Sequence, residues 1–165
     1  MLYFEDLSVG YTYGIEPPAS PPFDFHQVTA EQIISFAEAF DPRPQHTDPE
    51  AARETTFGGL IASGAHVIAI WTRLALEAQL ASRPIAVIAG LGSELRLVKA
   101  VRPDDVLGLQ IEITDLRASK SRPTSGVLTA RHRMSNQKGE LVFDNRAVTL
   151  VSRRSEATPE TGGET

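Results

Sequence analysis

The distribution of apolar and polar residues divides the chain into a helical first half and a β-rich second half. Between residues 30 and 40, apolar side chains recur every three or four positions, which predicts an amphipathic helix. Residues 107–114 instead alternate between apolar and polar or small side chains, as in a half-buried strand. Residues 126–134 and 141–151 predict two more strands, and residues 85–98 one or two, interrupted near a pair of glycines.

Local start and turn signals support these elements. Thr29 followed by Gln32 matches a capping box at the start of the first helix. Asp48 before Pro49 predicts a short second helix, because aspartate is a preferred N-cap and proline is tolerated at the first helical position. The segment 136–139, Asn-Gln-Lys-Gly, predicts the hairpin turn between the last two strands.

A third helix has a different character. After Ser63 and Gly64, residues 65–76 are apolar almost all round for three turns, so we expect this helix to be buried on most sides, with Ser63 as its cap. In a chain of 165 residues the natural cover is a curved sheet. Helices followed by a run of strands therefore predict a single α+β domain, an antiparallel sheet wrapped around one central apolar helix.

Composition and charge indicate the extent of the domain and argue against several classes of partner and site. We assign residues 1–153 to the domain and expect residues 154–165, rich in Thr, Gly, Glu and Pro, to be a disordered acidic tail. The net charge is −5 and the body has no basic stripe, which argues against nucleic acid as a partner. Cysteine is absent, which excludes disulfides and thiolate metal sites. The first residues of the sequence do not resemble a signal peptide, and no apolar run is long enough to cross a membrane. We therefore expect a cytoplasmic protein without membrane contact.

The strongest candidate chemistry lies just beyond the first helix, where Asp41 and His46 are separated by Pro42 and Pro44. Two prolines oppose a continuous helix, so we expect both side chains on a stiff, irregular loop. An acid and an imidazole can transfer protons near neutral pH. The alternative is that Asp41 hydrogen-bonds its own backbone as a turn residue.

Short motifs in a fixed order extend over residues 2–152. They are the segments 3–7, 28–40, 41–46, 48–52, 57–59, 62–64, 101–105 and 136–140. Together they make the chain similar to the MaoC-like acyl dehydratases, which include the R-specific enoyl-CoA hydratases of the hotdog fold.

The resemblance implies specific roles for residues of this chain. Asp41 and His46 would hold and activate a water molecule, and the backbone N–H of Gly64 would stabilise the oxyanion. The hydroxyl of Thr72, two turns into the central helix, would support the pair. The implied reaction is reversible hydration of a 2-enoyl thioester, most simply an acyl-CoA, to the (R)-3-hydroxyacyl thioester. Coenzyme A would enter only as part of the substrate, and no other cofactor is implied.

The resemblance also implies a homodimer joined edge to edge, with acyl pockets at the interface and higher assembly left open. Two positions depart from the family pattern, Arg43 where an amide is common and Ser63 where histidine is common, and both could alter substrate choice. The Arg43 guanidinium could pair with a carboxyl-bearing substrate. The acyl chain is left open, and its pocket would depend on side chains such as Phe57 and Trp71.

Other polar residues have simpler readings. Lys99 and Arg102 could meet the phosphates of coenzyme A, but a solvated turn at a strand end is a slightly better explanation of both residues. His26, His66 and His132 are interpreted as structural, His66 as a satisfied core or interface residue. Arg131 and Arg133 share one strand face and are explained by salt links across the sheet.

A metal site is disfavoured on sequence grounds. Asp41, His46 and Asp48 offer suitable ligand atoms, but the sequence contains no third ligand at a diagnostic spacing and Asp48 is better explained as a helix cap. We therefore expect no metal.

Two other functions remain to be separated from hydration. A hotdog thioesterase would use an acid on or near the central helix, yet that helix has none before Glu77. A catalytically silent acyl-binding subunit is opposed by the presence of Asp41, His46 and Gly64. Ser63 lacks the flanking glycine pattern of a serine hydrolase nucleophile.

Overall fold

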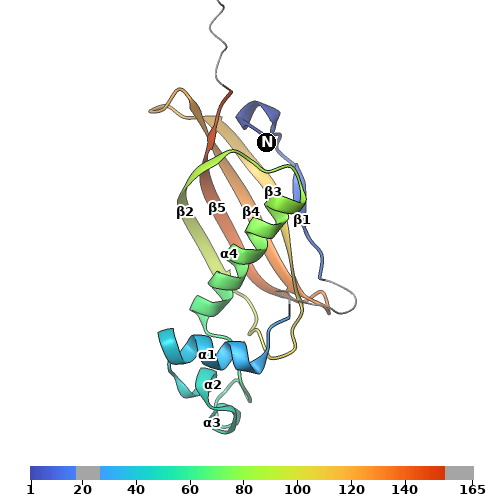
Figure 1. Ribbon diagram of the computed structural model, residues 1–165, viewed down its shortest axis with the longest axis vertical. Coiled ribbons are helices and arrows are strands. Elements are labelled where there is room, and N and C mark those ends of the chain that lie inside the picture. Colours follow the sequence, from blue (N-terminus) through green and yellow to red (C-terminus); the bar gives the residue numbers. More distant parts are fainter. Residues whose placement is uncertain (18–26, 155–165) are drawn as a thin grey trace, which may run out of the picture.

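A five-stranded antiparallel sheet curves around one long helix in the computed structural model, which describes residues 1–17 and 27–154 (Figure 1). The strand order is β1-β3-β4-β5-β2, and the helix is α4 (Gly64–Ala81). The strands are β1 (Thr12–Ile15), β2 (Val87–Leu97), β3 (Leu107–Ala118), β4 (Ser125–Asn136) and β5 (Leu141–Ser152). This confirms the predicted α+β class and the wrapped central helix of the hotdog fold.

The strands differ from the prediction in two places. Segment 85–98 forms one strand, β2, with register shifts at Val87/Ala89 and Gly90/Gly92 instead of a break. The four-residue β1 was not predicted, and it pairs only with β3, at the opposite edge from β2. The hairpin turn is confirmed: Gly139 adopts a φ of 74° and donates its N–H to the Asn136 carbonyl at 2.9 Å.

Helix α4 packs on the sheet through one face only. Val67, Leu74 and Ala78 are buried, whereas Leu76 is 50% and Leu80 66% exposed. The prediction that this helix is buried on most sides is therefore wrong for a single chain. Five strands curve far enough to cover one face of the helix, and the rest stays open beside the β2 edge.

The remaining helices lie beyond one end of the sheet, next to the first turn of α4 (Figure 1). They are α1 (Ala30–Phe40), α2 (Pro44–Thr47) and α3 (Pro49–Arg53). Thr29 and Gln32 form the predicted capping box of α1, and Asp48 caps α3 by accepting from the N–H groups of Glu50 and Ala51.

The two ends of the domain meet at a short 3-10 helix, η1 (Phe4–Asp6). Arg154 forms an ion pair with Asp6 at 2.6 Å, and Arg153 pairs with Glu5 at 2.7 Å. Arg154, the first residue of the predicted tail, is thus bonded to this 3-10 helix. The rest of the predicted tail, residues 155–165, and His26 lie outside the described residues.

The sheet face opposite α4 carries the predicted salt links. Arg131 binds both oxygens of Asp144 at 2.9 and 3.0 Å, and Arg96 binds the same carboxylate at 2.8 Å. Arg133 donates to Gln110 at 2.8 Å. Hydrogen bonds from Arg131 and then Arg96 lower the pKa of the Asp144 carboxyl group to about 2.

Asp144→Asn is expected to lower the free energy of unfolding by about 1–2 kcal/mol at pH 7. The change removes the ion pairs of Asp144 and leaves Arg131 opposite Arg146 without a compensating charge. A carboxyl group with a depressed folded pKa stabilises above its unfolded pKa. The difference from wild type should therefore shrink as the pH falls from about 4 toward 2. Urea unfolding across this range tests the prediction. Glu94→Gln, on the same face, should have little effect, and a pH-independent difference for Asp144→Asn would contradict the ion-pair account.

Candidate functional site

Asp41 is placed by the end of α1. Its backbone N–H donates to the Ala37 carbonyl at 2.8 Å, and Pro42 prevents the helix from continuing. Its carboxylate does not bond its own backbone, which was the alternative reading. Arg43 takes both oxygens, Nε to Oδ1 and Nη2 to Oδ2, each at 2.6 Å.

His46 lies on a short helix instead of an irregular loop. Pro44 is the first residue of α2, where its missing N–H costs no hydrogen bond and its fixed φ suits a helix. The second proline therefore starts a helical turn, and the expectation of an irregular segment is wrong for residues 44–47. The turn carries the His46 side chain into the protein, where the residue is only 4% exposed.

The His46 ring is oriented by the chain segment that leads into α4. Its Nδ1 lies 2.8 Å from the Ile61 carbonyl oxygen, which can only accept, so Nδ1 bears the proton. The Ile61 N–H donates in turn to the Gln45 carbonyl at 3.2 Å. In the neutral ring Nε2 then presents a lone pair. This Ile61 contact was not predicted, because a backbone carbonyl leaves no signal in side-chain chemistry.

The His46 lone pair faces the Asp41 carboxylate, with Nε2 3.7 Å from Oδ2. Both atoms are hydrogen-bond acceptors, and the distance is too long for a direct hydrogen bond. One water could donate a proton to each. The hydrogen bond from Arg43 lowers the pKa of the Asp41 carboxyl group, which keeps it ionised. The predicted pair is therefore assembled as one acceptor site.

Gly64 opens α4 three residues after Ile61. Ser63 caps the helix by accepting from the His66 N–H at 3.2 Å, and Ala62 is held by the Val101 carbonyl at 2.9 Å. The first N–H of a helix has no intrahelical acceptor and lies at the positive end of the helix dipole. A Cβ at Gly64 would come within 2.9 Å of Leu97 Cδ1, so glycine lets β2 approach this amide closely.

Two further predicted residues have other bonds. The Thr72 hydroxyl donates to the Ile68 carbonyl at 2.9 Å, within α4, and no bond joins it to Asp41 or His46 in the described part of the chain. Ser63 is fully buried as the predicted cap, so its hydroxyl does not reach the surface of a single chain. A supporting role for either residue in the reaction stays a prediction.

Three further predicted residues contact other protein groups at the surface: Phe57, Lys99 and Arg102. Lys99 forms an ion pair with Glu140, and Arg102 donates to the Phe57 carbonyl at 2.5 Å. Phe57 itself is 44% exposed. These contacts agree with the turn reading of the two basic residues, and their contact with coenzyme A phosphates stays a prediction.

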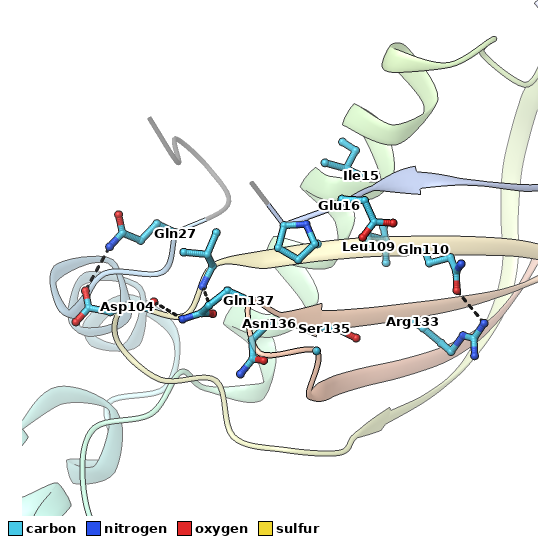
Figure 2. A pocket seen from close by; sticks show the side chains of 14 residues that line it. Ile15, Glu16, Gln27, Asp104, Leu109, Gln110, Arg133, Ser135, Asn136 and Gln137 are labelled. Atoms are coloured by element: carbon cyan, nitrogen blue, oxygen red, sulfur yellow. Dashed lines mark hydrogen bonds between the residues drawn. The ribbon is translucent and has the colours of Figure 1, made fainter. Parts of the chain in front are cut away.

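A cavity of about 810 Å³ lies beside the end of β1 and the start of β3, and its lining side chains are drawn in Figure 2. Several of its polar side chains bond to protein groups, among them Gln27 to Asp104 at 3.3 Å and Arg133 to Gln110 at 2.8 Å. None of Asp41, His46 or Gly64 lines it. It is also bordered by Pro17 and Gln27, the residues that flank the undescribed segment 18–26, and we assign it no function.

Within residues 1–17 and 27–154, no three His, Asp or Glu side chains come together in a way that could hold a metal ion. Among the helices of the same residues, none is both long and apolar enough to cross a membrane.

Comparison with known proteins identifies the family and the fold. A family model described as "MaoC like domain" matches residues 16–135. The chain is 34% identical over 128 residues to YdeM of Bacillus subtilis, a match that covers 77% of this chain and 88% of YdeM. It is 29% identical over 164 residues to the 3-hydroxybutyryl-CoA dehydratase of Methylorubrum extorquens, covering 96% and 90% of the two chains.

Solved structures give the same result. The MaoC-like dehydratase from Rhodospirillum rubrum is 38% identical with a TM-score of 0.82, over 94% of this chain and all of that one. The (R)-hydratase of A. caviae involved in PHA biosynthesis is 25% identical with a TM-score of 0.64, over 88% and 97%. The wrapped helix and these matches together define a hotdog protein of the MaoC-like dehydratase kind. The chain belongs to the MaoC-like dehydratase family.

Arg43→Gln is expected to raise the pKa of the Asp41 carboxyl group, because the hydrogen bond from Arg43 is the main cause that lowers it. Carbon-detected NMR titration of the Asp41 carboxyl signal measures this change. Arg53→Gln removes a comparable arginine, paired with Glu50 on α3, and should leave the Asp41 midpoint in place. An unchanged midpoint in Arg43→Gln would show that the bidentate pair does not form in solution.

Proposed function

We propose that the protein catalyses reversible hydration of a 2-enoyl-CoA to the (R)-3-hydroxyacyl-CoA. The observation that carries the proposal is the His46 Nε2 lone pair, which faces the Asp41 carboxylate at 3.7 Å on a turn bonded to the entry of α4. The arrangement offers a water two acceptors on a turn that is bonded to Ile61, three residues before the Gly64 amide. The names of two relatives, a 3-hydroxybutyryl-CoA dehydratase and an (R)-hydratase, support the same chemistry.

The reaction begins with the water held between the two acceptors. As its oxygen bonds to the β carbon of the enoyl thioester, His46 Nε2 takes one proton. The electrons of the C=C bond move to the thioester oxygen, and the Gly64 N–H at the start of α4 stabilises the resulting enolate. The imidazolium returns the proton to the α carbon, so atoms and charge balance.

Asp41 and Arg43 have separate parts in this scheme. Asp41 stays a carboxylate, orients the water through its second proton and stabilises the transient His46 imidazolium. Arg43 holds Asp41 through two hydrogen bonds and so fixes the position of its oxygens. Its side chain is 62% exposed, which leaves part of the guanidinium open to solvent or substrate.

Thioester hydrolysis is the second candidate, and the structure gives it less support. The first acid on α4, Glu77, is paired with Arg73 at 2.8 Å and lies more than three turns from Gly64. A silent acyl-binding subunit is also disfavoured, because such a role needs no ordered pair of acceptors beside a free helix amide.

We further propose that the active form contains two copies joined along β2. This strand forms one edge of the sheet and all of its residues are exposed in the single chain. Its large apolar side chains include Val87, Leu91 and Leu95. An exposed, apolar edge strand readily pairs with another chain, and a second copy would also cover the open side of α4.

Purified protein with crotonyl-CoA and longer 2-enoyl-CoAs tests the proposed activity. Loss of the conjugated-enoyl absorbance without release of free thiol is the expected result, with the R product identified by chiral analysis. Thiol release would replace hydration by thioester hydrolysis. A His46→Asn preparation, purified in parallel, controls for hydratases of the expression host. No turnover at any chain length would reject the proposal.

A further inference from the structure

A cavity of about 370 Å³ lies between α4 and the concave face of the sheet. Thr72, Ala75 and Gln79 contribute to its wall and recur every three or four positions along one flank of α4. Gly64 lies eight positions before Thr72, within about a quarter turn of the same flank. The volume is in the usual range for a small-molecule site. The cavity therefore follows the flank of the helix that starts at the Gly64 amide.

An imidazole in the cavity wall is held by the only tryptophan of the chain. Trp71 Nε1 lies 3.1 Å from His132 Nδ1, and the rings meet edge to face with centroids 5.5 Å apart. An indole N–H can only donate, so Nδ1 of His132 is the acceptor. The neutral His132 ring must then carry its proton on Nε2.

Burial favours this neutral form. It lowers the pKa of His132 to about 4. Protonation of Nδ1 would also break the bond from Trp71. At neutral pH His132 therefore offers a single N–H donor with a fixed direction.

This donor has no protein acceptor among residues 1–17 and 27–154. The fully buried polar side-chain atoms without a partner in these residues are His66 Nδ1 and Asn145 Oδ1. Nε2 of His132 is not one of them, so it is not sealed inside the protein, and His132 lines the cavity. The N–H group is thus open to whatever occupies this space.

The other walls decide the charge of the occupant. No Asp, Glu, Lys or Arg of the described residues lines the cavity; its polar groups are hydroxyls, an amide and the imidazole. A carboxylate here would lose its hydration without gaining a countercharge, which is costly. A neutral oxygen needs only one donor, and His132 supplies one.

Building on the proposed hydratase activity, we propose that His132 selects acyl chains that carry a neutral oxygen group, such as a ketone or hydroxyl, in their distal part. Trp71 is seven residues from Gly64, which places the donor roughly 10 Å along α4 from the amide that would hold the thioester oxygen. His132 is then a specificity-determining residue, and Trp71 a positioning residue that fixes its tautomer.

Binding of saturated acyl-CoAs, which cannot be hydrated, tests this inference without relying on turnover. Calorimetry would compare octanoyl-CoA with the 5-, 6- and 7-oxo derivatives of the same chain. At least one oxo derivative is expected to bind wild type about threefold to tenfold more tightly than octanoyl-CoA, the ratio typical of one neutral hydrogen bond. Equal binding of all four would overturn the proposal, whatever the enoyl-CoA assay shows.

Variants locate the source of the preference. His132→Leu should abolish the preference for the oxo derivative. Trp71→Phe should weaken this preference, because the His132 proton is then no longer held on Nε2. Thr149→Val removes another polar group of the cavity wall and should retain the preference. The measured quantity is the ratio of the affinities of one variant for the oxo derivative and for octanoyl-CoA. A purely structural effect of the substitution changes both affinities and leaves this ratio unchanged. Loss of the preference in Thr149→Val alone would assign the donor to Thr149 and reject the role of His132.

Discussion

His46→Asn is expected to lower kcat/KM for crotonyl-CoA by about two to four orders of magnitude, the usual contribution of a general acid–base group. The Asn side chain can still donate an N–H toward the Ile61 carbonyl, but it lacks the Nε2 lone pair that faces Asp41. His46→Ala removes both groups and should lose at least as much activity. The measurement is the initial rate of enoyl-CoA hydration.

Asp41→Asn should cause a loss of similar size. The amide cannot accept both hydrogen bonds from Arg43, nor can it stabilise the His46 imidazolium. Glu50→Gln, on the exposed surface of α3, is the matched carboxyl-to-amide control and should keep the wild-type rate. A near-normal rate in either Asp41→Asn or His46→Asn, with an unchanged circular dichroism spectrum, would exclude the proposed proton transfer.

Leu74→Ala is expected to lower the free energy of unfolding by about 2–5 kcal/mol, the range for a large-to-small change in a packed core. Leu74 is fully buried where α4 meets the sheet. The loss is a large part of the roughly 5–15 kcal/mol that stabilises a typical domain. Urea unfolding at one fixed protein concentration measures it, because association shifts apparent stability.

Leu80→Ala provides the comparison on the same helix. Leu80 is 66% exposed, so its truncation should cost much less. If the two variants lost the same free energy of unfolding, the packing of Leu74 in the interior of the fold would be contradicted.

The elements that the sequence predicted well have local causes. The capping box at Thr29 and the cap at Ser63 depend on hydrogen bonds within four residues, and both are present. Strand β3 was visible because one of its faces is buried and the other is not. Strand β1 was missed because its four residues are ordered by pairing with β3, which lies far away in the sequence.

The candidate site was predicted in part for the same reason. Spacing and motif resemblance were enough to select Asp41 and His46, which the structure brings within 3.7 Å. Two features of the site could not be predicted. The bond of His46 to the Ile61 carbonyl depends on the path of the backbone, and the hydrogen bonds from Arg43 to Asp41 depend on side-chain rotamers. The openness of α4 was missed because hydrophobicity shows that a surface must be covered, but not whether the same chain covers it.

Helices α1 to α3 lie beyond the end of the sheet, and backbone bonds such as those from Ile61 to Gln45 and from Ala62 to Val101 tie this region together (Figure 1). Segments with few links to a core open more easily than the core itself. Of the residues of α1 to α3, Ile33 alone is a fully buried member of the hydrophobic core cluster. We therefore expect the water-binding groups on these helices to lose their arrangement while the strands stay paired. On warming, enzymatic activity should fade before the sheet melts, and amide hydrogens of α2 should exchange with solvent sooner than those of β4.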